Sequence, residues 1–406
     1  MNTIELYNKK YDRNIQKLNL CSDRITNICP EIGQLQKLYT LFLHENNIVN
    51  ICPEIGRLKN LEILYLSINQ ITNMCPEIGQ LQNLQVLHLD NNQITNVCPE
   101  IGQLRNLQQL YLSHNRIMNV CSEIGQLQNL HLLYLDNNQI TNACPEIWKL
   151  QNLQDLDLSN NQITQIPPEI ELLKNLQNLN LNNNQMTQIS REIGLLKKLQ
   201  RLYLSGNRII NVCPEIGQLQ NLQVLYANNN QITGVCPEIG QLRNLQYLDL
   251  NSNQITNVFS EIGRLQNLRT LLLNNNEITN VSPEIGQLQN LQIIGLSNNL
   301  ITNVSSEIGQ LQNLRIINLS NNLITIIPAN IIQCNNLVSI EYHGNNIEYY
   351  IPCVQRFLNR IRNTGGTINN IYNDRQNVHT SSIQTSVKNS IFNLLNTNYE
   401  INYYIE

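Results

Sequence analysis

The chain contains 406 residues, and its 26 lysines and arginines against 30 aspartates and glutamates leave a net charge of −4 at neutral pH. This balance excludes the strongly basic surface on which charge-driven binding to nucleic acid or to an anionic membrane depends. The sequence also contains no run of about 18 consecutive apolar residues, so we expect no transmembrane helix.

Residues 1–14 carry no apolar stretch that would suit a secretory signal peptide. We therefore expect an intracellular, cytoplasmic protein whose 11 cysteines are free thiols. The abundance of asparagine, isoleucine and tyrosine favours an AT-rich genome, such as that of a large DNA virus or a protist. Because Leu6 and Tyr7 stand just ahead of a repetitive region, residues 1–14 are predicted to form an N-terminal cap over the open end of its core.

From residue 15 onward the sequence repeats every 23 residues without insertion or deletion. Residues 15–359 contain 15 such units, the last of them degenerate and capping, with the consensus LQxLYLxxNQITNVCPEIGQLQN. A repeat of this length overrides the two or three globular domains that the chain length alone would suggest.

Each unit has two halves with different apolar periods. The segment LxxLxL alternates from its fourth position and ends in polar residues, which predicts a short strand. The segment PEIGQL predicts one or two helical turns, because Pro fits the first helical position and the following Glu favours the positive end of the helix dipole. A single unit cannot bury enough apolar surface to be stable alone, so the units are predicted to stack as coils of one solenoid.

Asparagine occupies the ninth position of every unit except the first, which has Asp23. A buried carboxamide at this position can donate to and accept from backbone groups of the next coil. The predicted structural asparagines are Asn46, Asn69, Asn92, Asn115, Asn138, Asn161, Asn184, Asn207, Asn230, Asn253, Asn276, Asn299, Asn322 and Asn345.

The pattern LxxLxLxxNxI followed by PEIGxLxNL resembles the leucine-rich repeat family, and most closely its 23-residue intracellular class, found in Ras-suppressor-like and plant Ras-group proteins. The resemblance covers residues 15 to about 350. It implies an α/β solenoid, a horseshoe with a parallel concave β-sheet of about 15 strands and short helical turns on the convex side, used mainly to bind proteins. The sequence departs from related repeats in having Cys-Pro where they often have Pro-Pro.

Position 15 of the unit holds a cysteine in eight coils: Cys29, Cys52, Cys75, Cys98, Cys121, Cys144, Cys213 and Cys236. A thiol just ahead of a helical turn could have a lowered pKa and be reactive. However, Pro167, Ser190 and Phe259 occupy the same position in other coils, and a row of thiols does not converge on one point as zinc ligands must. We interpret the column as apolar filling.

Side chains at positions 3, 5 and 7 are expected to point out of the concave sheet, because strand side chains alternate between the two faces. Position 5 supplies five consecutive rings, and aromatic rings beside polar groups are typical of protein-binding surfaces. The rings could instead support the sheet by stacking on one another. The candidate binding residues are Phe42, Tyr65, His88, Tyr111, Tyr134, Tyr203, Tyr226, Asp90, Asp136 and Asp157.

Two groups of residues could carry chemistry. Cys21, His44 and Glu45 could form a nucleophile, a base and an orienting group. His88, Asp90 and His114 could hold a metal ion. Neither group comes with a predicted cleft, and the sequence contains no P-loop, GxGxxG or CxxC motif, so we predict no catalytic residue, no metal site and no cofactor.

The consensus decays after Asn345, and the apolar residues Tyr349, Ile351, Val354, Phe357 and Leu358 predict a closing helix. Residues 360–382 are rich in Gly, Asn and Ser and predict a linker. Residues 383–406 are predicted to form an amphipathic helix and a tail. This helix could fold back on the solenoid or dock a partner.

These patterns predict a non-enzymatic scaffold that binds an unknown partner protein on its concave face, with neither nucleic acid nor membrane as a partner. The alternative is a substrate-recognition adaptor whose C-terminal tail recruits an effector such as a ubiquitin ligase. A thiol-dependent or metal-dependent enzyme is an alternative of another class. The sequence does not indicate an oligomeric state.

Overall fold

The computed structural model describes residues 3–363 and 367–369, which belong to one compact unit, Met1–Asn369. The helix predicted within residues 383–406 and most of the predicted linker lie outside the described residues. No helix in the described part of the chain is long and apolar enough to span a membrane.

Two short strands, β1 (Thr3–Leu6) and β2 (Lys9–Asp12), form an antiparallel hairpin ahead of the repeats. Ile4 and Leu6 of β1 are buried and join the core of the first coil. The Tyr7 hydroxyl donates to the carbonyl of Asn27 and accepts from the backbone N–H of Cys29, each at 3.0 Å. The hairpin thus covers apolar surface that the first coil would otherwise expose.

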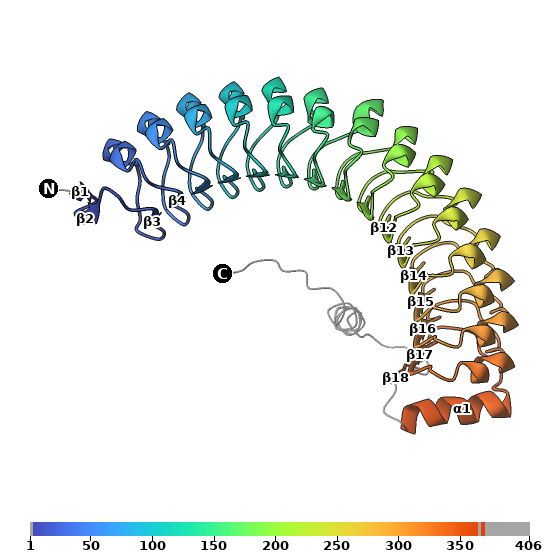
Figure 1. The fold of residues 1–406 in the computed structure, drawn as a ribbon. Helices are drawn as coiled ribbons and strands as arrows, with labels where there is room; N and C mark the ends of the chain where they lie inside the picture. The colour runs from blue at the N-terminus through green and yellow to red at the C-terminus, as the bar shows by residue number, and fades with distance from the viewer. Residues whose placement is uncertain (1–2, 364–366, 370–406) are drawn as a thin grey trace. The chain divides into compact units, whose positions relative to one another are not determined.

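The 15 repeats and one strand that follows them form a parallel sheet of 16 strands, in which every strand pairs with its neighbours in sequence order. Figure 1 shows these strands along the inside of an arc, with the short helices along the outside. The expected solenoid with a parallel concave sheet is therefore confirmed. Its strands are β3 (Lys17–Asn19), β4 (Thr40–Phe42), β5 (Ile63–Tyr65), β6 (Val86–His88), β7 (Gln109–Tyr111), β8 (Leu132–Tyr134), β9 (Asp155–Asp157), β10 (Asn178–Asn180), β11 (Arg201–Tyr203), β12 (Val224–Tyr226), β13 (Tyr247–Asp249), β14 (Thr270–Leu272), β15 (Ile293–Gly295), β16 (Ile316–Asn318), β17 (Ser339–Glu341) and β18 (Thr367–Asn369).

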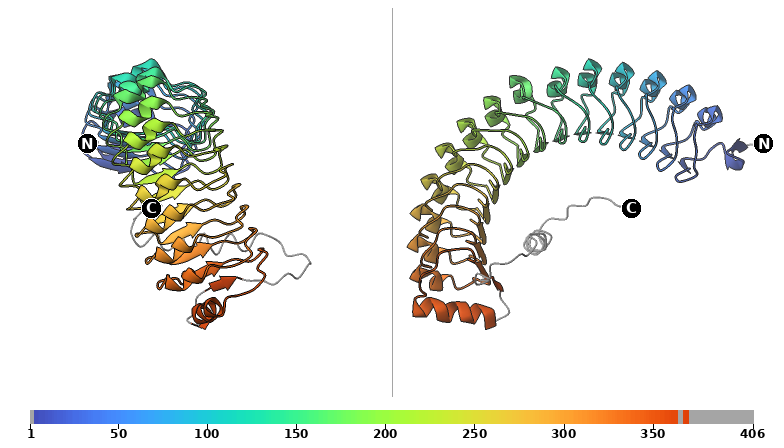
Figure 2. Two further views of the ribbon diagram at one scale, coloured as in Figure 1. Left: turned by 90° about the vertical axis from the view of Figure 1, so that its right-hand side faces the viewer. Right: turned by 180° about the vertical axis from the view of Figure 1, so that it is seen from behind.

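The convex side consists of five-residue 3-10 helices, one for each of the first 14 coils. The view from behind in Figure 2 shows short helices along the outer side of the arc. In most coils Pro is the first helical residue and Glu the second, which agrees with the expected helical turns. The helices are η1 (Pro30–Gln34), η2 (Pro53–Arg57), η3 (Pro76–Gln80), η4 (Pro99–Gln103), η5 (Ser122–Gln126), η6 (Pro145–Lys149), η7 (Pro168–Leu172), η8 (Arg191–Leu195), η9 (Pro214–Gln218), η10 (Pro237–Gln241), η11 (Ser260–Arg264), η12 (Pro283–Gln287), η13 (Ser306–Gln310) and η14 (Ala329–Gln333).

The ninth-position asparagines link each coil to its neighbour, and Asn138 shows the pattern. Its Oδ1 accepts the backbone N–H of Ile117 at 2.9 Å, and its Nδ2 donates to the carbonyls of Leu112 and Leu135, both at 3.0 Å. Ile117 and Leu112 belong to the preceding coil, so the expectation of bonds to the next coil was wrong in direction. The Asn138 side chain points toward the preceding coil, where the carbonyl of Leu112, just after β7, accepts its hydrogen bond.

The residue before each of these asparagines adopts a left-handed backbone conformation. Asn91, Asn137 and Asn160 have φ angles of 54°, 53° and 52°, and glycine occupies the position at Gly206 and Gly344. Asparagine and glycine tolerate this region best, which explains the Asn-Asn pair in so many units. Ile68, with φ 54°, is a β-branched exception and carries backbone strain.

A glycine column on the convex side sets how closely the coils approach. A Cβ atom at Gly102 would lie 2.6 Å from the carbonyl oxygen of Glu123 in the next coil. Trp148 and Glu171 occupy the same position in the sixth and seventh coils, and the Trp148 side chain is fully buried. The coils must therefore stand further apart on the convex side at this point than in the rest of the stack.

A helix and one more strand end the described fold. Helix α1 (Pro352–Asn363) buries Val354, Phe357 and Leu358 against the last coil, as the predicted closing helix should. The predicted linker does not begin at residue 360, because α1 continues to Asn363 and residues 367–369 form β18, which pairs in parallel with β17. The solenoid gains a sixteenth strand in this way.

Replacing Asn138 with alanine should lower the free energy of unfolding by about 3 kcal/mol, because buried backbone groups of two coils lose their partners at about 1–3 kcal/mol each. The amide of Ile117 should also exchange its hydrogen faster, since Asn138 is its acceptor. Urea unfolding and hydrogen exchange measure the two effects. The control is Gln139→Ala at an exposed position, and equal behaviour of the two variants would contradict the role of the carboxamide.

Two glycine substitutions test the spacing of the coils. Gly102→Ala should lower stability by about 1–3 kcal/mol, because its Cβ would overlap a backbone carbonyl that cannot rotate away. Gly234→Ala should change stability by less than about 0.5 kcal/mol, since its Cβ would meet no atom within 4 Å. Thermal unfolding of the two variants compares them, and a neutral Gly102→Ala would show that the convex side is not closely packed.

Candidate functional site

The predicted ring residues of the N-terminal half form a continuous row on the concave face, which we call the aromatic row: Phe42, Tyr65, His88, Tyr111 and Tyr134. Successive ring centroids lie 5.0, 4.4, 4.0 and 5.4 Å apart along the row. The first three pairs are stacked nearly parallel, whereas Tyr111 and Tyr134 meet edge to face at 89°. All five side chains are half-buried, so the rings support one another and still offer surface to a partner.

A second, shorter group of rings follows after two coils. Tyr203 and Tyr226 stack with centroids 5.3 Å apart, as their shared position in the repeat predicts. Tyr247 extends this group at 4.7 Å from Tyr226, although it comes from position 3 and not from position 5. Sequence reasoning looked for rings at position 5 alone and so missed Tyr247, although positions 3 and 5 were both expected on the concave face.

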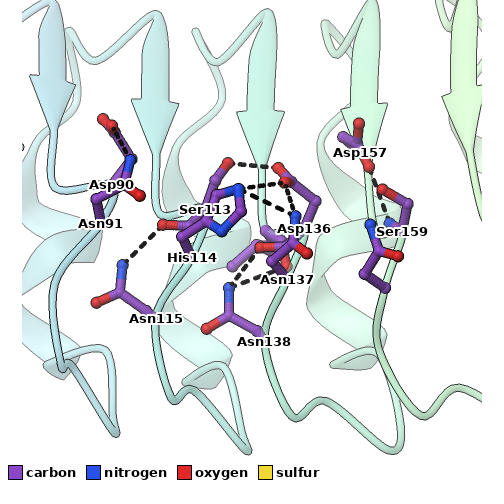
Figure 3. Close-up of polar contacts among 12 residues, drawn as sticks. Asp90, Asn91, Ser113, His114, Asn115, Asp136, Asn137, Asn138, Asp157 and Ser159 are labelled. Carbon is purple, nitrogen blue, oxygen red and sulfur yellow. Dashed lines mark hydrogen bonds and ion pairs between the residues drawn. The ribbon is translucent and has the colours of Figure 1, made fainter.

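Carboxylates lie beside the aromatic row where the strands end, and Figure 3 shows their contacts. Asp90 lies 3.4 Å from the His88 ring and accepts from Asn91 at 3.1 Å. Asp136 accepts from the hydroxyl of Ser113 and, at 2.7 Å, from the side chain of Asn137. These bonds hold both carboxylates at the rim of the face without pairing either with a lysine or arginine in the described structure.

Between the two groups of rings the concave face is polar. Asp157 takes the place next to Tyr134 in the sheet register, and its carboxylate accepts the backbone N–H of Ser159 at 2.8 Å and the Asn180 side chain at 2.8 Å. Asp155 accepts from Asn178 at 2.9 Å, and Asn178 in turn accepts from the Arg201 guanidinium at 3.0 Å. Asp155, Asn178 and Arg201 were not among the predicted site residues.

Burial is the main cause of the raised pKa at both aspartates of β9. The neighbouring Asn178 side chain and the charge of Arg201 lower the pKa of Asp155 but do not cancel the effect of burial. The bonds from Ser159 and Asn180 oppose burial at Asp157, where the charge of Asp136 raises the pKa further. The centre of the face therefore holds carboxylates whose charge is only partly compensated.

The two groups considered for chemistry do not assemble. No hydrogen bond links Cys21 to His44 within the described structure; Glu45 accepts from the hydroxyl of Ser22 at 2.9 Å, and the His44 ring lies 6.0 Å from both the Phe42 and Tyr65 rings. His114 lies 4.0 Å from Asp136 rather than with His88 and Asp90. Residues 3–363 and 367–369 contain no group of three histidine, cysteine or acidic side chains able to hold a metal ion.

The cysteine column is half-buried at the start of the 3-10 helices, and all 11 thiols are free. Its sulfur atoms face backbone carbonyls of the preceding coil; Cys121 Sγ, for example, lies 3.6 Å from the carbonyl oxygen of Cys98. Burial raises the pKa of Cys75 to about 11 and that of Cys98 to about 12. Burial thus opposes the lowered pKa that a reactive thiol requires, which favours the interpretation of the column as apolar filling.

Several models of repeat families match the chain. The model described as "Leucine rich repeat" matches residues 13–71, 59–117 and 289–347, and "Leucine-rich repeat region" matches residues 140–233 and 173–280. "Leucine Rich repeats (2 copies)" matches residues 266–311. A search of curated protein sequences produced no match.

Solved structures show the same architecture. A leucine-rich repeat protein of Leptospira interrogans is 36% identical over 88% of this chain and 96% of its own, with a TM-score of 0.73. An internalin of Listeria monocytogenes is 26% identical over 77% of this chain and 91% of its own, with a TM-score of 0.69. The ectodomain of a plant receptor kinase from Arabidopsis thaliana, solved in complex with Casparian strip integrity factor 2, is 26% identical over 82% of this chain and 44% of its own, with a TM-score of 0.63.

Asp249 on β13 should make stability depend on pH. It is only 7% exposed, and burial raises its pKa to about 6, against about 3.9 in an unfolded chain. The folded state thus binds the proton more tightly, so this group's stabilising contribution is complete below about pH 4 and is lost as the pH rises through 6.

Asp249→Asn should therefore raise the free energy of unfolding at pH 7 by about 3 kcal/mol and leave it unchanged at pH 4. Asparagine can keep the bond that Asp249 accepts from the N–H of Asn251 at 2.9 Å, and it already occupies the same repeat position at Asn180 and Asn318. Urea unfolding at the two pH values measures the difference. An equal gain at both would show that titration of Asp249 is not the cause.

Proposed function

Because this chain belongs to the leucine-rich repeat family, whose fold generally mediates protein–protein interaction, we propose that it is a non-enzymatic scaffold that binds a partner protein along its concave face. The aromatic row is the observation that carries the proposal. Five half-buried rings on neighbouring strands offer a large, rigid contact area that costs little conformational entropy when it is covered.

The concave face also has the mixed chemistry of an interface. Its rings stand beside Asp90 and Asp136, so apolar contact area and hydrogen-bonding groups lie within one surface. The plant receptor kinase ectodomain has a similar fold and was solved with a bound factor, which supports a binding role for this chain. The repeats of the N-terminal half are the favoured contact region because they contain the longer group of rings.

Affinity purification with quantitative mass spectrometry tests the proposal with matched variants. Tyr65→Asn combined with Tyr111→Asn should reduce recovery of the partner at least tenfold, because aromatic anchors contribute most of the energy of an interface. Asparagine stands at the same repeat position in Asn180, so the variant should fold, which circular dichroism checks. The control is Tyr349→Asn, where a tyrosine 60% exposed lies outside the row.

Equal partner recovery by the row variant and the control would contradict binding on the concave face. A second experiment uses a variant that lacks residues 370–406, which lie outside the described residues. Unchanged recovery of every bound protein supports a simple scaffold. Loss of one protein with retention of another would instead assign the chain to the alternative, an adaptor whose tail recruits an effector.

A further inference from the structure

The middle of the concave face has an excess of negative charge. In the fourth to eighth coils, positions 3, 5 and 7 contain Asp90, Asp136, Asp155 and Asp157 but no lysine or arginine. The nearest guanidinium on the face, that of Arg201 in the ninth coil, bonds to Asn178 and not directly to a carboxylate. A partner covering this region must supply positive charge or leave carboxylates desolvated and unpaired.

The carboxylates act on one another and on the aromatic row. The charges of Asp155 and Asp90 contribute to the raised pKa of Tyr111, after burial and Tyr65, and the charge of Asp136 contributes to that of Asp157. The four carboxylates and the tyrosine therefore share a single electrostatic environment across several coils. This environment attracts cationic groups and repels the phosphates of nucleic acids.

An open hollow of about 280 Å³ lies beside Asp155, between the fifth and eighth coils. Its lining includes Gln109, His131, Gln154, Gln177 and Asn178 together with the Asp155 side chain. Carboxamide oxygens and a carboxylate are hydrogen-bond acceptors, and a guanidinium has five donors and no acceptor. The hollow thus combines space, acceptors and a negative charge at one place on the face.

We propose that the partner contacts this face through a basic polypeptide segment that places an arginine or lysine side chain in the hollow beside Asp155, with Asp157 as a second anionic contact. The inference rests on the proposed function and adds the chemical class of the partner. A cation in the hollow offsets the cost of keeping these half-buried carboxylates ionised, because a charge-assisted bond replaces the water that they have lost.

Fluorescence anisotropy with labelled nona-arginine tests the proposal, with labelled nona-glutamate as the comparison. The wild-type chain should bind nona-arginine at least tenfold more tightly than nona-glutamate at low salt. Asp155→Asn combined with Asp157→Asn should weaken nona-arginine binding at least tenfold and reduce its salt dependence. The variant should fold, because Asn178 and Asn180 occupy the same two positions in the next coil.

The control is Glu169→Gln combined with Glu171→Gln, which removes the same charge from the convex side of the same coil, where both glutamates are exposed. This variant should bind nona-arginine as the wild type does. Equal weakening by both double variants would show that only net charge matters and would overturn the proposal, as would unchanged binding by the aspartate variant. If these outcomes appear while the tyrosine variant still loses its partner, the scaffold function stands and the cationic segment does not.

Discussion

The structure depends on one constraint: the backbone of each coil must satisfy its hydrogen bonds in the coil beside it. The three-residue strands are too short to form a stable sheet by themselves, and the chain beyond each strand is joined to its neighbours by separate backbone hydrogen bonds, such as that from the N–H of Asn137 to the carbonyl of Ser159. The carboxamide of the ninth-position asparagine bonds these irregular segments; Asn161, for example, bonds backbone groups on both its own coil and the preceding one. Because this geometry recurs at every layer, a single inserted residue would leave buried groups of two coils unpaired.

The same constraint explains where the sequence is free to vary. Core positions contact two neighbours and keep their apolar character, whereas the outward side chains of the strands face the concave side and vary in type. Departures from the repeat consensus on the convex side and on the concave side both occur near the seventh coil. On the convex side Trp148 and Glu171 replace glycine, and on the concave side Asp155 and Asp157 interrupt the rings. The hollow beside Asp155 thus lies next to the coils in which the glycine column is interrupted.

Most of the repeating fold could be predicted from the sequence because its period is constant and its core residues are invariant in type. The strands, the helical turns with Pro30 and Glu31 at their start, and the closing helix around Phe357 all follow from local patterns. Strand β18 could not be predicted, since it forms only because α1 returns the chain to the sheet edge. Whether the asparagine side chains bond to the preceding or to the next coil depends on the orientation of the carboxamide, which the sequence does not specify.

The candidate site was harder to predict than the fold. The row from Phe42 to Tyr134 follows from one column, but the contact of Tyr226 with Tyr247 joins two columns and depends on the offset between adjacent strands. The hollow beside Asp155 likewise arises from side-chain lengths on four coils. The Tyr226–Tyr247 contact and the hollow arise from residues that differ between units, and a consensus sequence does not contain those differences.

The stacking of the coils has a further consequence for anything that lies along the concave face. Neighbouring strands repeat about every 4.8 Å, whereas an extended peptide advances about 3.4 Å per residue. The two spacings coincide only after about five coils, which correspond to about seven residues of the peptide. The four coils that separate Tyr65 from Asp155 correspond to about six residues of such a peptide, so the proposed partner would need its apolar and cationic anchors about six residues apart to reach both.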